Sequence, residues 1–374
     1  MIKRRTGPET SRHINEKERH CQNRLDVRPE LCSIIMIAPL SQRTSFTALA
    51  STVRPNQNAT IIYNPLAGPA DMAGAIERVA DFWRARDWTV DVRPTQYAGH
   101  AVALAREAAV AEKRLVLAAG GDGTLGEVAN GLVHTQTVMG PLPTGTGNSF
   151  GKELRMPRPN LIDHRALVES AALLASGRVH HMDMGRFVGG KYWLLWTGTG
   201  VDSYVVERME PRSKLSKRLG PVGYVAEALS IAPRFPPMEA VVRVDDQLYE
   251  GTFLLVLVAN CRRFAGGEVL LNPRARLDDG VLEVYLFRGH GAVQIVSYLW
   301  QLWRGHHEEN PGITVVSGRS VQVHTGLTMP VHTDGDPAGQ TPFSCHVEPA
   351  ALRLLVPRTA PSALFTGPGL SIFP

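Results

Sequence analysis

The stretch Leu115–His134, which reads LVLAAGGDGTLGEVANGLVH, carries the residues whose chemistry is clearest. It begins as an apolar run with strand character, turns at Gly120, Gly121 and Gly123, and restarts with a helical pattern. Glycine permits backbone angles and close approaches that a side chain forbids. Outward-facing amides at such a turn, together with the dipole of the following helix, favour a phosphate anion. Asp122, within the turn, suits a metal ion or a water molecule beside that phosphate.

Two residues after the turn set the expected start of the helix. Thr124 and Glu127 have the three-residue spacing of a capping box, which predicts that the helix begins there. The turn is not a Walker loop, because no GKS or GKT follows, and its glycine spacing is not that of a dinucleotide fingerprint. A tight strand-to-helix turn without a ligand is the alternative for this stretch taken alone.

Composition places the 374-residue chain among globular proteins, with 44% hydrophobic and 20% charged residues. That length is enough for two hydrophobic cores. A net charge of +5 favours an anionic partner such as a nucleotide or an acidic membrane surface, and no nucleic-acid reading motif occurs. The four cysteines lack metal-binding spacing, which indicates a reducing compartment. No apolar run is long enough to span a bilayer.

A regular alternation of strand and helix patterns begins at Ala59 and predicts a doubly wound parallel sheet. In such a sheet, ligands bind beyond the carboxyl ends of the strands, and each of three glycine-containing turns follows an expected strand. The expected strands are Thr60–Tyr63, Thr89–Val92, Arg114–Ala119 and Val138–Leu142, and the expected helices are Met72–Arg86, Gly99–Ala111 and Ile162–Ser176.

After Gly177 the pattern changes to short strand-like runs separated by turn residues, which is typical of an antiparallel sandwich or barrel. The polar residues 1–58 are predicted to be a disordered leader, with Met36 as an alternative start. The expected strands are His180–Phe187, Tyr192–Gly198, Glu239–Val244, Gln247–Leu257, Val281–Phe287, Thr314–Ser317, Ser320–His324, Val331–Asp334 and Cys345–Pro349, with helices at Gly223–Ile231 and Ala292–Arg304.

Three motifs in this order resemble the catalytic family of diacylglycerol and sphingosine kinases. They are Asn64-Pro65-Leu66-Ala67-Gly68, the run GGDGTLGEVANGL from Gly120, and Gly145-Thr146-Gly147-Asn148-Ser149-Phe150. The resemblance extends from about Ile61 to about Pro357. It implies a nucleotide-binding α/β domain at 59–180 with a C-terminal return near 350–358, a β-sandwich domain for the lipid substrate at 181–349, and a tail at 359–374.

The resemblance also implies an ATP site built from the three turns and the neighbouring strand end. A solvated loop threonine is the alternative for Thr95. The residues assigned to the nucleotide are Asn64, Gly68, Thr95, Gly120, Gly121, Asp122, Gly123, Thr124, Glu127, Thr146 and Asn148.

The segment His332–Pro337, HTDGDP, resembles the family's DGE element and therefore assigns the general base to Asp334. Asp336 stands where the family usually has glutamate, and we expect it to organise Mg²⁺ together with Asp122. These three aspartates are the expected catalytic residues. A hairpin turn without a catalytic role is the alternative for the DG pair.

A second acidic turn, RLDDGV from Arg276, matches a family element that holds a structural Mg²⁺ in bacterial members. The residue carried over is Asp279, since carboxylates and carbonyl oxygens suit a hard cation; a plain hairpin turn is the alternative. Three departures from the family pattern accompany these motifs: Ala67, Gly126 and Ser149 replace the usual serine, asparagine and aspartate.

The resemblance implies an ATP- and Mg²⁺-dependent lipid kinase that phosphorylates a hydroxyl of a membrane lipid, of diacylglycerol or sphingoid type. We expect a cytoplasmic enzyme in peripheral contact with the inner face of the membrane, without a nucleic-acid partner; a homodimer stays open. The basic stretch Arg208–Arg218 contacts lipid headgroups or is a solvated loop, and Trp300 and Trp303 face lipid or pack on the sandwich. An NAD kinase-like enzyme and a nucleotide-binding regulator without turnover remain alternatives.

Overall fold

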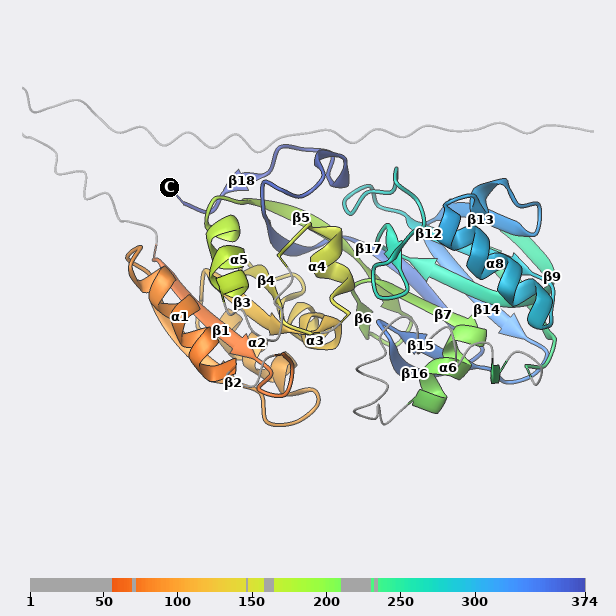
Figure 1. Ribbon diagram of the computed structural model, residues 1–374, viewed down its shortest axis with the longest axis horizontal. Helices are drawn as coiled ribbons and strands as arrows, with labels where there is room; N and C mark the ends of the chain where they lie inside the picture. Colours follow the sequence, from red (N-terminus) through yellow and green to blue (C-terminus); the bar gives the residue numbers. More distant parts are fainter. Residues whose placement is uncertain are drawn as a thin grey trace, which may run out of the picture. The chain divides into compact units, whose positions relative to one another are not determined.

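The computed structural model describes residues 56–68, 72–145, 147–157, 165–209, 230–231 and 235–373 (Figure 1). The expected parallel sheet is present, with β4, β3, β1 and β2 side by side in that order. Strands β1, β3 and β4 are buried along their whole length, which explains why they read as continuous apolar runs. The strands are β1 (Asn58–Tyr63), β2 (Thr89–Pro94), β3 (Leu115–Gly120) and β4 (Val138–Pro143).

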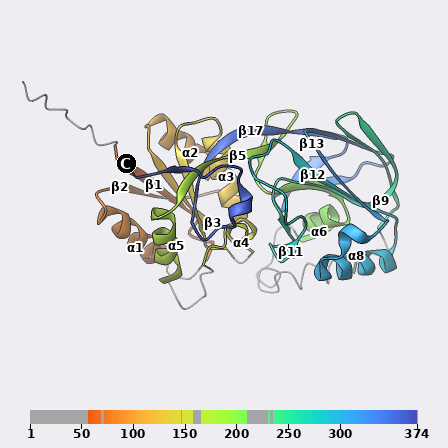
Figure 2. The same ribbon diagram turned by 90° about the horizontal axis from the view of Figure 1, so that it is seen from above.

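Helices cover both faces of this sheet (Figure 2). Helix α1 (Met72–Arg84) packs against α5 (Arg165–Ala175) on one face, and α2 (His100–Val110) packs against α3 (Asp122–Leu132) on the other. A short helix, α4 (Ser149–Glu153), follows β4. The alternation of strands and helices along the sequence therefore produces the doubly wound arrangement that it predicts.

Helix α3 begins three residues earlier than the capping-box spacing predicts, because Gly121 and not Thr124 is the N-cap residue. Its first residue is Asp122, so Thr124 lies inside the first turn. The carboxylate of Glu127 instead accepts the backbone N–H groups of Gly99 at 2.9 Å and Ala101 at 3.2 Å, at the start of α2. The capping-box prediction was wrong, because the glutamate caps the neighbouring helix rather than its own.

The rest of the chain forms the predicted antiparallel, sandwich-like part. Strand β9 is shared within it: its first half pairs with β8, and its second half pairs with β7 and β12. The elements are β5 (Arg178–Phe187), β6 (Tyr192–Trp193), β7 (Trp196–Gly200), α6 (Val201–Met209), β8 (Met238–Val244), β9 (Gln247–Ala259), β10 (Arg263–Phe264), β11 (Val269–Leu270), β12 (Leu282–Arg288), α8 (Ala292–Arg304), η2 (His307–Glu309), β13 (Ile313–Gly318), β14 (Ser320–Thr325), β15 (Pro330–Thr333), β16 (Asp336–Gln340), β17 (Phe343–Val356), η3 (Ser362–Leu364) and β18 (Leu370–Ser371).

Two local predictions in this part were wrong. The single strand expected over Tyr192–Gly198 is interrupted at Leu194 and Leu195, between β6 and β7. Arg208 lies in helix α6 and not in a loop. The stretch that follows it, with most of the helix predicted over Gly223–Ile231, lies outside the described residues, as does the predicted leader up to residue 55.

Strands β5 and β17 run through both parts of the sheet. They pair in antiparallel fashion from the Cys345–Phe187 pair to the Val356–Arg178 pair. Near its end β17 lies beside β4, with Leu354 opposite the methionine at position 139 in parallel register. The domain boundaries expected near residues 180 and 349 fall within these two strands, and the described residues belong to one compact unit.

The C-terminal segment, predicted as a tail, packs along both parts of the sheet. The backbone N–H of Thr366 donates to both carboxylate oxygens of Asp278, at 2.9 and 2.8 Å. Further on, the ring of Phe373 stacks on Trp83 at a centroid distance of 6.1 Å and meets Trp88 edge-on at 5.9 Å. The segment therefore links an acidic turn of the β part to the helical face of the parallel sheet.

Replacing Phe373 with alanine should lower the free energy of unfolding by about 1–3 kcal/mol, because two aromatic contacts and their buried area are lost. The measurement is the thermal unfolding midpoint by circular dichroism. Leu370→Ala, at a side chain that is 65% exposed in the same segment, is the control and should leave the midpoint unchanged. Equal midpoints for both variants would show that the segment adds nothing to stability.

Candidate functional site

The turns that follow β1, β3 and β4 meet at one edge of the parallel sheet. Thr144 joins all three, since its N–H donates to the carbonyl of Gly120 at 2.9 Å and its hydroxyl donates to the carbonyl of Ala67 at 2.9 Å. The side-chain amide of Asn64 reaches the hydroxyl of Thr124 at 3.5 Å. Each turn is thus held by the other two.

Only some of the glycines are required by this packing. A Cβ atom on Gly145 would lie 2.8 Å from the Cα of Gly121, and one on Gly120 would lie 2.4 Å from the side chain of Thr124. Gly68 has a φ of +120°, which favours glycine. Gly121 has a φ of −82°, and a Cβ atom added to it would lie 3.7 Å from its nearest neighbour, the Cα of Gly145. The folded chain therefore has room for a side chain at this position.

Two more of the residues assigned to the nucleotide, Thr95 and Asn148, lie along the same edge. The N–H of Thr95 donates to the carbonyl of Tyr63 at 2.8 Å, which puts this threonine beside the end of β1. Asn148 adopts the left-handed conformation, with a φ of 51°, and its side-chain amide donates to the carbonyl of Gly145. Thr146 lies outside the described residues.

Asp122 connects the glycine turn to the start of α4. Its Oδ2 accepts the N–H of Ser149 at 2.8 Å and its Oδ1 accepts the N–H of Phe150 at 3.1 Å. Burial raises the pKa of the Asp122 carboxyl above its ordinary value, and the two amides oppose that shift. Both carboxylate oxygens are therefore already engaged by the protein.

Asp334 and Gly335 form a two-residue loop between β15 and β16, with Thr333 paired to Asp336. Both loop residues have positive φ values, 52° and 87°, which is the type I′ geometry that an Asp-Gly pair favours. The hairpin predicted from the DG pair is present, and it aims one carboxylate inward.

The Asp334 carboxylate lies against the interruption between β6 and β7. Its Oδ1 accepts the N–H groups of Leu195 at 2.7 Å and Trp196 at 3.1 Å, and its Oδ2 accepts that of Leu194 at 2.8 Å. Burial raises the pKa of Asp334 to about 6; the three amides lower it and the charge of Asp122 raises it. The side chain replaces the strand partner that these amides would otherwise need.

The structure brings the three expected catalytic carboxylates to the first turns of α3. A Cβ atom on Gly126 would lie 3.3 Å from Oδ2 of Asp334, and one on Gly123 would lie 3.4 Å from Oδ2 of Asp336. Asp122 is the first residue of the helix. The absence of a side chain at Gly126, costly to a helix in itself, gives Asp334 room beside α3.

Several supporting residues escaped the sequence analysis. Asn130 joins α3 to β6, because its side chain donates to the carbonyl of Tyr192 at 2.9 Å and accepts the N–H of that residue at 3.0 Å. Beneath the hairpin, Nε2 of His332 lies 2.6 Å from Oδ2 of Asp202, and both side chains are buried. The partners are 62 and 130 positions apart, so no local spacing signals them.

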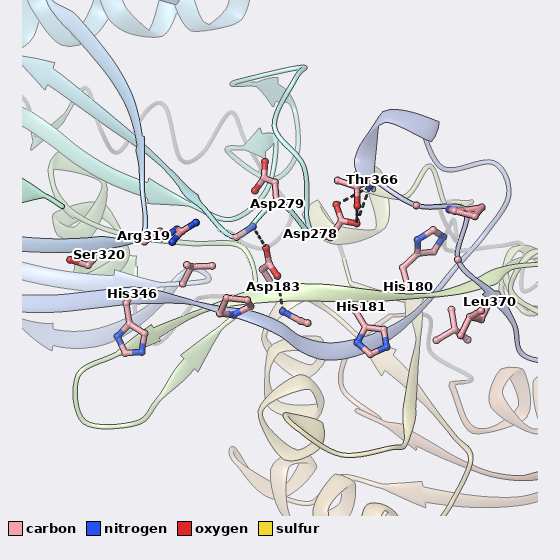
Figure 3. Close-up of a pocket in the computed structure, with 18 residues that line it drawn as sticks. His180, His181, Asp183, Asp278, Asp279, Arg319, Ser320, His346, Thr366 and Leu370 are labelled. Atoms are coloured by element: carbon pink, nitrogen blue, oxygen red, sulfur yellow. Dashed lines mark hydrogen bonds between the residues drawn. The ribbon is translucent and has the colours of Figure 1, made fainter. Parts of the chain in front are cut away.

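Asp279 lies elsewhere, in a cavity of about 890 Å³ that it shares with Asp183, Asp278 and His180 (Figure 3). Asp183 accepts the N–H groups of residues 280 and 350 at 2.6 and 2.7 Å. Burial and the neighbouring carboxylates raise the pKa values of Asp183 and Asp279. Within the described ranges, no group of three or more His, Cys, Asp or Glu side chains is arranged to hold a metal ion.

Residues 58–187 match the family described as Diacylglycerol kinase catalytic domain, and residues 196–356 match the YegS C-terminal NAD kinase beta sandwich-like domain. The chain belongs to the diacylglycerol kinase catalytic domain family. It is thus an enzyme of a lipid kinase family, and both the predicted family and the predicted two-part fold class are confirmed.

Members of this family resemble the chain over most of its length. The diacylglycerol kinase of Bacillus subtilis (strain 168) is 28% identical over 288 residues, 76% of this chain and 92% of the relative. That of Staphylococcus carnosus (strain TM300) is 27% identical over 288 residues, 76% and 90% respectively. A crystal structure of a diacylglycerol kinase from Bacillus anthracis str. Sterne shares the fold, with a TM-score of 0.62 at 22% identity over 82% of this chain and 98% of that chain.

Replacing Asp122 with alanine should lower the free energy of unfolding by about 0.5–2 kcal/mol, because α4 loses the acceptor for its first amides. Thermal unfolding without nucleotide or Mg²⁺ is the measurement. Asp336→Ala, at an exposed carboxylate of the same site, is the matched control and should change stability by less than about 0.5 kcal/mol. If both variants unfold like the parent protein, Asp122 does not stabilise the turn and acts on a ligand alone.

Proposed function

We propose that the protein transfers the γ-phosphoryl group of ATP to a hydroxyl group of a membrane lipid alcohol, with diacylglycerol as the first candidate acceptor. The observation that carries this proposal is the meeting of Asp122, Asp334 and Asp336 beside the three glycine-containing turns. Phosphoryl transfer requires a phosphate cradle, a divalent cation and a group that orients the acceptor hydroxyl. Family membership and the names of the relatives in Bacillus subtilis and Staphylococcus carnosus support the choice of acceptor.

The triphosphate would be held at the edge of the parallel sheet. The turns from β1, β3 and β4 meet there, and the N-terminus of α3 adds its positive dipole end. Asn64, Thr95 and Asn148 stand at the ends of the neighbouring strands and are the side chains we assign to the nucleotide.

Asp336 and Asp122 are the residues that would hold Mg²⁺, which would supply positive charge beside the phosphate groups. Magnesium in kinases is held by one or two carboxylates together with substrate phosphates, so a cluster of three protein ligands is not required. Asp336 fits this donor set because its carboxylate is exposed beside the first turn of α3. Asp122 stands next to it, although both of its oxygens accept amides. A structural Mg²⁺ at Asp279 is a separate part of the proposal.

Asp334 is the proposed general base. A carboxylate has about four acceptor sites, and three are taken by backbone amides, which leaves capacity on Oδ2, the oxygen that faces α3. A pKa of about 6 leaves the group ionised at neutral pH yet close enough to it for proton transfer. The three amides hold the carboxylate in one orientation, so the acceptor hydroxyl has to bind in reach of Oδ2 for proton transfer to occur.

The acceptor is a lipid, so the proposal includes peripheral contact with the inner face of the membrane from the cytoplasm. No helix among the described ranges is long and apolar enough to cross a bilayer. A homodimer remains a prediction.

The proposal is tested with γ-labelled ATP, Mg²⁺ and separate acceptors: diacylglycerol, a sphingoid base, ceramide and NAD. Labelled lipid phosphate, identified by mass, is the expected product. Labelled phosphate on NAD without any lipid product would assign the protein to an NAD kinase-like activity. ATP binding without any product would assign it to nucleotide-dependent regulation.

We expect kcat/KM to rise with pH and to level off above about 6, because only ionised Asp334 can accept the proton of the hydroxyl. Below that pKa the rate should fall about tenfold per pH unit. Asp334→Asn should lower kcat by about 10²–10⁴-fold and remove this limb of the profile. Calorimetric ATP binding by the variant is the control for folding. A variant that keeps both the rate and the limb contradicts the assignment of the base.

A further inference from the structure

Helix α8 buries one face and leaves the other in solvent with four large apolar side chains. Ile295, Tyr298 and Leu302 form the buried face. The exposed side chains recur at intervals of three or four positions, so they form a single stripe along the helix. They are Val293, Val296, Trp300 and Trp303, which are 87, 50, 55 and 75% exposed.

The composition of this stripe suits the boundary between water and hydrocarbon. Trp300 and Trp303 lie beside each other, with ring centroids 5.4 Å apart, and the guanidinium of Arg304 lies 5.6 Å from the Trp300 ring. Arg304 is the only charged residue among the thirteen of α8. Tryptophan and arginine pair an apolar body with a polar group, which is why both gather at membrane interfaces.

We propose that the exposed stripe of α8, formed by these four side chains, docks the enzyme on a lipid bilayer. The inference rests on the proposed function, since an acceptor dissolved in a bilayer requires the enzyme to reach it. A helix of thirteen residues is about 20 Å long and about 10 Å wide, so its face covers roughly 200 Å². A stable protein interface buries about 800 Å² on each partner, so this stripe alone is too small for a second copy.

The charge around α8 indicates that docking is mainly apolar. Two exposed carboxylates, Glu308 and Glu309, follow the helix in η2, and Glu308 pairs with Arg274 at 3.7 Å. Binding through α8 should therefore depend weakly on salt. Docking through a basic loop, such as the one expected from the sequence near Arg208–Arg218, would instead weaken as salt increases.

The position of α8 connects it to the candidate active site. Strand β11 lies beside α8 and carries Leu270, which is 37% exposed. The hairpin formed by β10 and β11 lies on α4, where Lys152 donates to the carbonyl of Gly266 and pairs with Glu268 at 2.7 Å. The β10–β11 hairpin thus lies between α8 and α4 (Figure 2), and α4 starts at the third turn of the phosphate cradle, so we expect docking through α8 to hold that side of the cradle near the bilayer.

The tryptophans provide a direct measurement on the full chain. Of the six in the sequence, the four outside α8 are at most 6% exposed: Trp83, Trp88, Trp193 and Trp196. Adding phosphatidylcholine vesicles with brominated acyl chains should therefore quench only the emission of α8 and shift it to shorter wavelength. Emission that is neither quenched nor shifted at saturating lipid overturns the proposal.

A double variant, Trp300→Ser with Trp303→Ser, should weaken vesicle flotation at least about tenfold, because both large apolar side chains are lost. Val110→Ser with Val188→Ser is the matched control, since these side chains are 85 and 73% exposed and lie outside α8, and its flotation should be unchanged. Circular dichroism confirms that both variants are folded. Wild-type flotation should change by less than about twofold between 0.05 and 0.5 M salt. Loss of binding at high salt, or equal binding by the two double variants, overturns the proposal.

Activity assays separate this inference from the proposed function. On short-chain diacylglycerol dispersed in detergent, the tryptophan double variant should match the parent protein, whereas on vesicles its rate should fall about tenfold. If the parent protein phosphorylates no lipid but still floats with vesicles in a way that requires the two tryptophans, the proposed function is contradicted and the docking face is supported. If the tryptophan double variant keeps full activity on vesicles and sedimentation shows that it has lost only self-association, the stripe is a dimer contact and the docking proposal is overturned.

Discussion

The site depends on one buried constraint, the three backbone amides of Leu194, Leu195 and Trp196 that converge on the carboxylate of Asp334. Buried amides require acceptors, and two of these three lie in the interruption between β6 and β7, outside any strand pairing. A single side chain takes the place of a strand partner. The type I′ turn fixes where that side chain points, so the geometry of a two-residue loop decides the position of the proposed base.

This arrangement requires two distant parts of the chain to stay in register. The glycine turn belongs to the parallel strands, and the hairpin of Asp334 belongs to the antiparallel strands, about 210 positions later in the sequence. Strands β5 and β17 pass through both, and Phe373 at the end of the chain packs on Trp83 of α1. Contacts far from the site therefore hold the glycine turn and the Asp334 hairpin at a fixed separation. The close approach of the Asp334 carboxylate to Gly126 depends on that separation.

Periodicity was sufficient to predict the elements whose burial is simple. Strands buried on both faces and helices with one apolar stripe follow directly from their residue pattern, and the bounds of α8 were predicted to the residue. The errors share a physical cause. Thr124 and Glu127 satisfy a local rule, but the glutamate finds the free amides of another helix, and local spacing contains no information about that competitor. The sequence also did not predict helix α6. Its Asp202 pairs with His332 of β15, and local spacing contains no sign of a partner so far along the chain.

The candidate site shows the same division between what is local and what is tertiary. The motifs identified Asp122, Asp334 and Asp336 by type. The amides that bind Asp334 come from a segment that no motif includes, and those that bind Asp122 come from the end of the third motif, about 27 positions away. In the structure, the carboxylate oxygens of Asp122 and Asp334 accept backbone N–H groups, and the same oxygens are the ones proposed to act on the substrate or the cation.

The charges of the two carboxylates are coupled, since the charge of Asp122 raises the pKa of Asp334. A cation near Asp122 would offset that charge and lower the pKa of Asp334, so the proposed base would be most fully ionised when the nucleotide site is filled. Gly126 permits this coupling by leaving no side chain between the helix and the base.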